Sequence, residues 1–152
     1  MRQKKVFGSV LLVSVLLFLM VGIAGCALQG EFVLDGYSDC EEYFEDGFGD
    51  SVDYCKYFYT KEDDALFQNS VDYKEVTDAE ISDLIAYFEE YRQTMSKYQD
   101  KYDFNVSAVN AGDYYVLEDD YLTEETSIPY SNYTLYYYDI ETHTLYHIHS
   151  NI

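Results

Sequence analysis

The chain has 152 residues, of which 9 are Lys or Arg and 29 are Asp or Glu, so its formal net charge is -20. This length suits one domain, and a hydrophobic content of 48% is too high for a chain that is disordered throughout. Because so acidic a protein repels phosphate backbones, the composition excludes a nucleic acid as the partner.

The N-terminus has the charge pattern of a secretory signal peptide. Arg2, Lys4 and Lys5 precede an uncharged apolar run over residues 6–24. This run closes with Ile23, Ala24, Gly25 and Cys26. These four residues resemble the lipobox of bacterial lipoproteins, which implies cleavage after Gly25 and attachment of a diacylglycerol to the sulfur of Cys26. We therefore expect a signal peptide at 1–25, a tether at 26–37 and a single domain at 38–152.

An uncleaved anchor is the alternative, because residues 6–28 carry no charge and are about long enough to span a bilayer. Lys and Arg near such a segment stay in the cytoplasm. Both interpretations therefore predict a membrane-bound protein whose body lies on the extracytoplasmic face. If the signal peptide is cleaved, the lipid on Cys26 is the contact with the membrane.

The two remaining cysteines are Cys40 and Cys55. Outside the cytoplasm an even pair usually oxidises, and a pair has only one connectivity. We expect a structural disulfide between them. Two reduced, buried thiols are the alternative.

In chain order, Ser38 and Glu41 fit a capping box, which predicts a short helix that ends at Gly47. Alternating aromatic residues predict a strand over 53–60. Thr60 and Asp63 fit the start of a second short helix that runs through Gln68.

Thr77 and Glu80 form the clearest capping box and open the main helix, over about residues 78–99. Its apolar residues recur at helical spacing: Ile81, Leu84, Ile85, Phe88, Tyr91, Met95 and Tyr98. Strands are predicted over 104–109 and 114–118, then a polar loop over 119–129. The chain closes with a hairpin of residues 133–139 and 144–149.

This order predicts an α+β fold. We expect an N-terminal signal or anchor helix, followed by an antiparallel sheet of about four strands that is packed by one main amphipathic helix and one or two short helices. The body also resembles small acidic, tyrosine-rich lipoproteins of Gram-positive bacteria, in part through its ending, Thr144 to His149. That resemblance implies no settled function.

Tyrosine is the first candidate for function, with 19 in the chain. Residues 136–138 are consecutive tyrosines, so both faces of their strand are aromatic. Solvent-facing rings such as Tyr136 and Tyr138 could bind sugars or an extended peptide. The alternative is that these rings pack a half-buried sheet.

Histidine is the second candidate. His147 and His149 lie two residues apart in a predicted strand, so they share a face, and this spacing occurs in zinc sites. The alternative is a polar outer face opposite a buried one.

Catalysis has no signature in the sequence: a nucleophile elbow, a P-loop and a dinucleotide fingerprint are all missing, and no cofactor is implied. We therefore expect a lipid-anchored binding or interaction module that displays a tyrosine-rich sheet to a cell-envelope glycan or protein. A metal-dependent protein and an enzyme without a recognisable motif are the alternatives.

Overall fold

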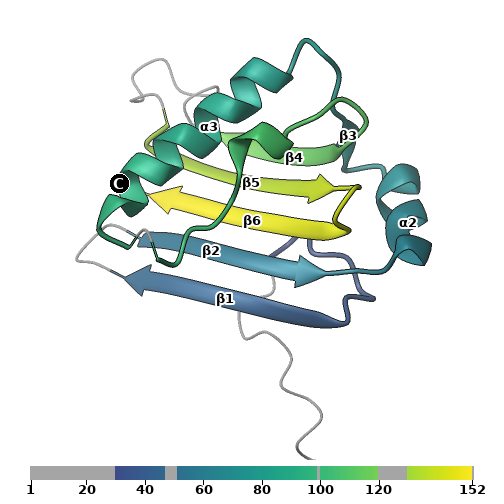
Figure 1. The fold of residues 1–152 in the computed structure, drawn as a ribbon, viewed down its shortest axis with the longest axis horizontal. Coiled ribbons are helices and arrows are strands. Elements are labelled where there is room, and N and C mark those ends of the chain that lie inside the picture. The colour runs from purple at the N-terminus through teal and green to yellow at the C-terminus, as the bar shows by residue number, and fades with distance from the viewer. Residues whose placement is uncertain (1–29, 47–50, 99, 120–129, 152) are drawn as a thin grey trace, which may run out of the picture.

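The computed structural model describes residues 30–46, 51–98, 100–119 and 130–151, so the predicted signal peptide and lipobox lie outside the described residues. The chain forms an antiparallel sheet with the strand order β1-β2-β6-β5-β4-β3 (Figure 1). The strands are β1 (Asp39–Asp46), β2 (Ser51–Phe58), β3 (Lys74–Glu75), β4 (Tyr114–Asp119), β5 (Asn132–Asp139) and β6 (Thr144–Asn151). The hairpin β5–β6 lies in the middle of the sheet, and β6 pairs with β2.

The prediction of about four strands is wrong, because the sheet has six, although the class remains α+β. The segment expected to be a helix before Gly47 is β1, which pairs with β2 along its whole length. The strand expected over 104–109 is instead a single 3-10 turn, η3 (Val106–Ala108). The Asn105 side chain accepts a hydrogen bond from the Ser107 N–H at 3.1 Å, which closes this turn.

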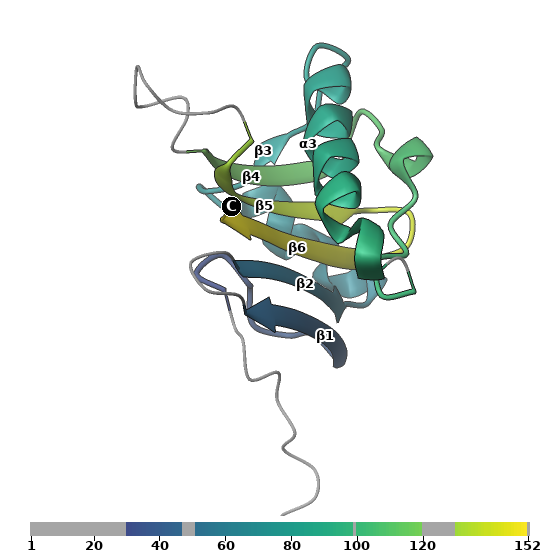
Figure 2. The ribbon, with the colours of Figure 1, turned by 90° about the vertical axis from the view of Figure 1, so that its left-hand side faces the viewer.

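The first face of the sheet is covered by α3 (Ile81–Thr94) and its 3-10 extension η2 (Met95–Tyr98), as Figure 2 shows. In the turn before the helix, the Glu80 carboxylate accepts the Thr77 N–H at 3.0 Å. The helix itself begins only at Ile81, with Glu80 as its N-cap and without a side-chain capping bond, so the predicted start at residue 78 is three residues early. The helix buries Leu84, Phe88 and Tyr91 against the sheet. Within the described residues, no helix combines the length and apolar character needed to cross a membrane.

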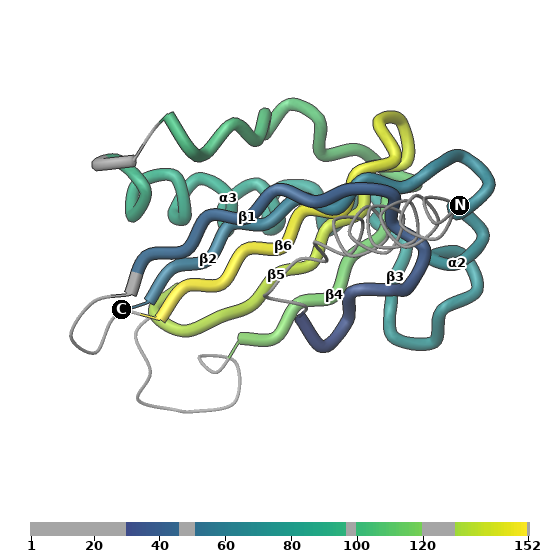
Figure 3. Tube along the Cα trace, turned by 90° about the horizontal axis from the view of Figure 1, so that it is seen from below, coloured from purple at the N-terminus to yellow at the C-terminus, as the bar shows by residue number. Residues whose placement is uncertain are grey.

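The second face is also covered, by the short helices η1 (Lys61–Asp63) and α2 (Asp64–Asn69) and by residues 30–37. These helices match the one predicted after Thr60. Phe67 of α2 stacks on Tyr138 of β5, with ring centroids 3.6 Å apart. Figure 3 shows α2 and the purple N-terminal segment on the side of the sheet opposite to α3. The molecule therefore has three layers.

Residues 30–37 form what we call the strap. The Tyr59 hydroxyl donates to the Leu34 carbonyl at 2.5 Å, and the Tyr73 hydroxyl donates to the Phe32 carbonyl at 2.9 Å. Val33 of the strap is itself buried. Gly36 has a φ of +118°, a conformation that glycine adopts without strain. Residues 30–37, which were expected to belong to the tether, are therefore part of the folded domain.

Candidate functional site

The tyrosines predicted to bind a ligand are inside the protein. Tyr136 is 3% exposed and Tyr138 is 0% exposed, and Tyr137 between them is buried on the other face. The strap packs on Tyr136 through Phe32, whose ring meets it edge-on at 5.4 Å. The Tyr138 hydroxyl donates to Asp64 of α2 at 2.6 Å. The display of a tyrosine-rich sheet is therefore wrong, because a layer of chain covers each face.

His147, one of the two predicted metal ligands, lies on the second face and is 6% exposed. Its ring is parallel to the ring of Tyr136, with centroids 4.5 Å apart. Its Nδ1 has no hydrogen-bond partner within the described residues. Burial, with a smaller contribution from His149, lowers the pKa of His147 to about 4. The imidazole is thus a neutral, packed ring.

His149, the other predicted ligand, is half-buried, and its Nδ1 lies 3.0 Å from the Thr134 hydroxyl. In the part of the chain that the structure describes, no group of three or more His, Cys, Asp or Glu side chains is placed to hold a metal ion. The two histidines share a face as predicted, but they do not form a metal centre there.

The predicted disulfide between Cys40 and Cys55 is absent, because Cys55 is a free, buried thiol. Cys40 lies opposite Tyr57, and Cys55 lies opposite Glu42. The two cysteines are therefore diagonal neighbours, whose separation of about 7–8 Å is too great for a disulfide. Burial, together with the charges of Glu42 and Asp53, raises the pKa of the Cys55 thiol to about 12. This thiol is a core residue.

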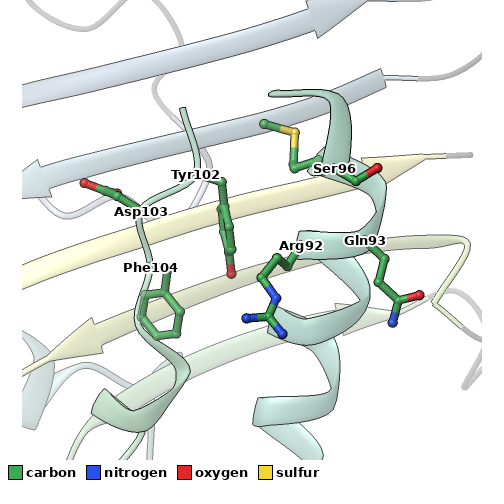
Figure 4. Close-up of a pocket in the computed structure, with 7 residues that line it drawn as sticks. Arg92, Gln93, Ser96, Tyr102, Asp103 and Phe104 are labelled. Atoms are coloured by element: carbon green, nitrogen blue, oxygen red, sulfur yellow. The ribbon is translucent and has the colours of Figure 1, made fainter. Parts of the chain in front are cut away.

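A cavity of about 590 Å³ lies beside the C-terminal end of α3 (Figure 4). The helix side contributes Arg92, Gln93, Met95 and Ser96, and the returning chain contributes Tyr102, Asp103 and Phe104. The side chains of Tyr102 and Phe104 are held in place by contacts with α3. Phe104 stacks on Phe88 with centroids 3.7 Å apart, and the Tyr102 hydroxyl donates to the Phe88 carbonyl at 3.2 Å.

The charged groups of this cavity are paired with neighbours. Asp103 accepts hydrogen bonds from Lys56 at 2.7 Å and from Tyr54 at 2.6 Å. Although burial acts in the opposite direction, these bonds hold the pKa of Asp103 below its ordinary value. Arg92 pairs with Glu89 one turn earlier in α3. The cavity therefore presents mainly the Gln93 amide and the Ser96 hydroxyl as polar groups that have no charged partner among the described residues.

A second polar cluster joins residues that are far apart in the sequence. The Nδ1 of His143 lies 2.9 Å from Asp64 Oδ1, which also accepts the Tyr138 hydroxyl. His143 sits in the β5–β6 turn with a φ of 53°, an uncommon conformation for a residue other than glycine. The cluster ties this turn to α2. Sequence spacing gave no signal for it, since 79 positions separate the histidine and the aspartate.

Sequence reasoning predicted no site at the cavity, although most of its lining residues fall in the helix predicted over 78–99 or the strand predicted over 104–109. Their convergence depends on the fold, because the chain between α3 and β4 returns across the end of the helix (Figure 1). No protein-family model matches the chain, and comparisons with curated proteins and with solved structures give no match.

Proposed function

We propose that this protein is a lipid-anchored, extracytoplasmic interaction module that binds its ligand in the cavity beside α3. The observation that carries the proposal is the position of the folded domain relative to the lipobox-like sequence. Cys26 stands four residues before Gly30, where the strap begins, and the lipobox-like residues follow a basic start and an apolar run.

The chemistry of the cavity favours an uncharged, polar ligand. Arg92 and Asp103 already have partners of opposite charge, so an ionic ligand would have to displace one of them. The Gln93 amide and the Ser96 hydroxyl are exposed donors and acceptors at the rim. Tyr102 and Phe104 line the cavity below these groups and are largely buried. A cell-envelope glycan fits this combination.

The anchor is tested by cell fractionation of the full-length chain and of its Cys26→Ala variant. We expect the wild type to remain with the membrane at its mature size and to incorporate an alkyne-labelled fatty acid. The variant should remain as precursor or leave the membrane, without label. Membrane retention of the variant at the mature size would contradict lipid anchoring.

The cavity is tested separately with the double variant Gln93→Ala/Ser96→Ala. We expect this variant to lose binding to purified cell-envelope glycan fragments in a calorimetric titration. The matched control is Gln68→Ala/Ser82→Ala, which removes the same two residue types from exposed positions outside the cavity. Equal binding by both variants would refute the cavity as the glycan site, and binding of a protein instead of a glycan would refute the ligand class.

A further inference from the structure

We propose that the side of the domain formed by the strap and α2 rests on the lipid bilayer, so that the cavity beside α3 points away from it. This inference rests on the proposed lipid attachment at Cys26. The proposed partner of this side is the phospholipid surface. The lipid anchor alone does not define which side of the domain faces the membrane.

The first argument is the length of chain between the anchor and the fold. Only residues 27–29 separate Cys26 from Gly30. Four residue steps span at most about 14 Å when fully extended. A folded domain of about 120 residues has a radius of gyration of about 14 Å, and hence a diameter of more than twice that value. The anchor therefore cannot reach round the domain to the α3 side.

The second argument is that Gly30 is fixed in position. It lies so close to the Tyr136 ring that a Cβ atom built on Gly30 would collide with it. The Val33 N–H donates to the Gly30 carbonyl at 3.1 Å, which forms a turn at the start of the strap. The two tyrosine hydroxyls that bind strap carbonyls hold the next residues. If the strap were free through Tyr37, the chain after Cys26 could extend about 39 Å, enough to let the domain turn over.

The third argument is the distribution of exposed apolar side chains. Among the described residues, the exposed large apolar side chains are Phe44, Leu66 and Val71. Phe44 points to the second face because it alternates in phase with Cys40 in β1. Leu66 belongs to α2, and Val71 follows α2 with 96% of its surface exposed.

A shallow hollow of about 560 Å³ lies between the strap and α2, where it is lined in part by Leu34, Ala65 and Leu66. It adds apolar surface beside Leu66 on the same side of the molecule. The opposite side, which carries α3, contributes none of the exposed large apolar side chains found in the described residues. A bilayer against the strap and α2 would cover this surface, and burial of apolar area from water is favourable.

The test uses tryptophan, because the chain contains no tryptophan of its own. Val71→Trp places a fluorophore beside α2, and the matched control Ser82→Trp places one on an exposed position of α3. The full-length, acylated proteins are reconstituted into phosphatidylcholine vesicles that contain a lipid with a quencher at the headgroup. The control site lies farther from the strap side by a sheet and a helix layer, about 10 Å each.

We expect several-fold stronger quenching of the tryptophan at position 71 than of the one at position 82. Equal quenching, or stronger quenching at position 82, overturns the orientation. Insertion of a 20-residue Gly/Ser linker between Gln29 and Gly30 should make the two signals similar while the protein stays on the vesicles, and a signal unchanged by the linker overturns the short connection as its cause. Protein that fails to float with the vesicles contradicts the lipid anchor instead, so the two failures are distinct.

Discussion

One buried ring, that of His147, should contribute strongly to destabilisation of this protein by acid. The imidazole lies against Tyr136 with 6% of its surface exposed, and its Nδ1 has no partner within the described residues to stabilise a charge. Burial lowers its pKa from an ordinary value of 6.5 to about 4 in the folded protein. Above pH 6.5 the ring is neutral in both the folded and the unfolded chain, so the full stability is present.

The magnitude follows from the difference between the two pKa values. Between pH 6.5 and about 4, the unfolded chain binds a proton at His147 that the folded chain does not bind. The free energy of unfolding then falls with decreasing pH by up to about 1.4 kcal/mol for each pH unit, and the loss levels off below the pKa of the folded state. The loss from this one residue approaches about 3 kcal/mol, a large part of the stability of a typical domain.

The assay is urea unfolding of soluble residues 27–152 at pH 7.0, 6.0, 5.0 and 4.5, compared with His147→Leu. The difference in unfolding free energy between the two proteins isolates His147, because the many carboxylates titrate in both. We expect this difference to shift steadily in favour of the variant as pH falls. The control His149→Leu, which changes a half-buried ring, should retain most of the wild-type slope. A wild-type to His147→Leu difference that is constant with pH would refute the reasoning.

Two further substitutions test the packing described above. Tyr137→Phe removes the hydroxyl that donates to the buried Asp113 carboxylate, and should lower the unfolding free energy by about 1.5–3 kcal/mol in urea titrations; an unchanged midpoint would contradict this role. Gly30→Ala forces a methyl group against Tyr136 and should speed amide hydrogen exchange in residues 31–37, with α3 unaffected; unchanged strap exchange would show that the close approach is unimportant.

The central part of the fold could be predicted from the sequence because its signals are local. Thr77 and Glu80 indicated the main helix to within a few residues of its start at Ile81, and its apolar spacing predicted the face that packs on the sheet. The final hairpin followed from alternating residues on each side of a polar turn, and it became β5 and β6. These elements depend on contacts within a few residues, which a single sequence contains.

The prediction for β1 failed because two local signals competed. Ser38 and Glu41 have the spacing of a capping box, but a helix after them would place Glu41 near Glu45 and Glu42 near Asp46, one turn apart. Such like-charge pairs destabilise a helix. In the strand, by contrast, Glu41 meets Lys56 of β2 at 2.5 Å. Repulsion between these like charges was thus a signal against a helix in the sequence, but the prediction gave more weight to the capping pattern.

The prediction that tyrosines of β5 bind a ligand failed for a different reason: the sheet is covered on both faces, so the molecule has three layers. Residues 136–138 point to alternate faces of β5, so three adjacent aromatic rings require either an exposed face or cover on both sides. The second cover is the strap, whose sequence contains Phe32, Val33, Leu34 and Tyr37. That apolar content, in a segment expected to be a tether, was the signal for a third layer. The cavity beside α3 depends on tertiary packing and had no sequence signal.

The proposed lipid anchor gives the acidic strand β1 a role in how neighbouring copies of the protein meet. Molecules anchored in one leaflet diffuse in two dimensions and meet edge to edge far more often than they would in solution. Edge strands invite pairing between neighbouring copies, and β1 is the strand at one end of this sheet. Its sequence, DCEEYFED, carries five carboxylates in eight residues, so two copies that approach along this edge bring like charges together. On the proposed lipid anchor, this repulsion would oppose the joining of neighbouring copies into a continuous sheet.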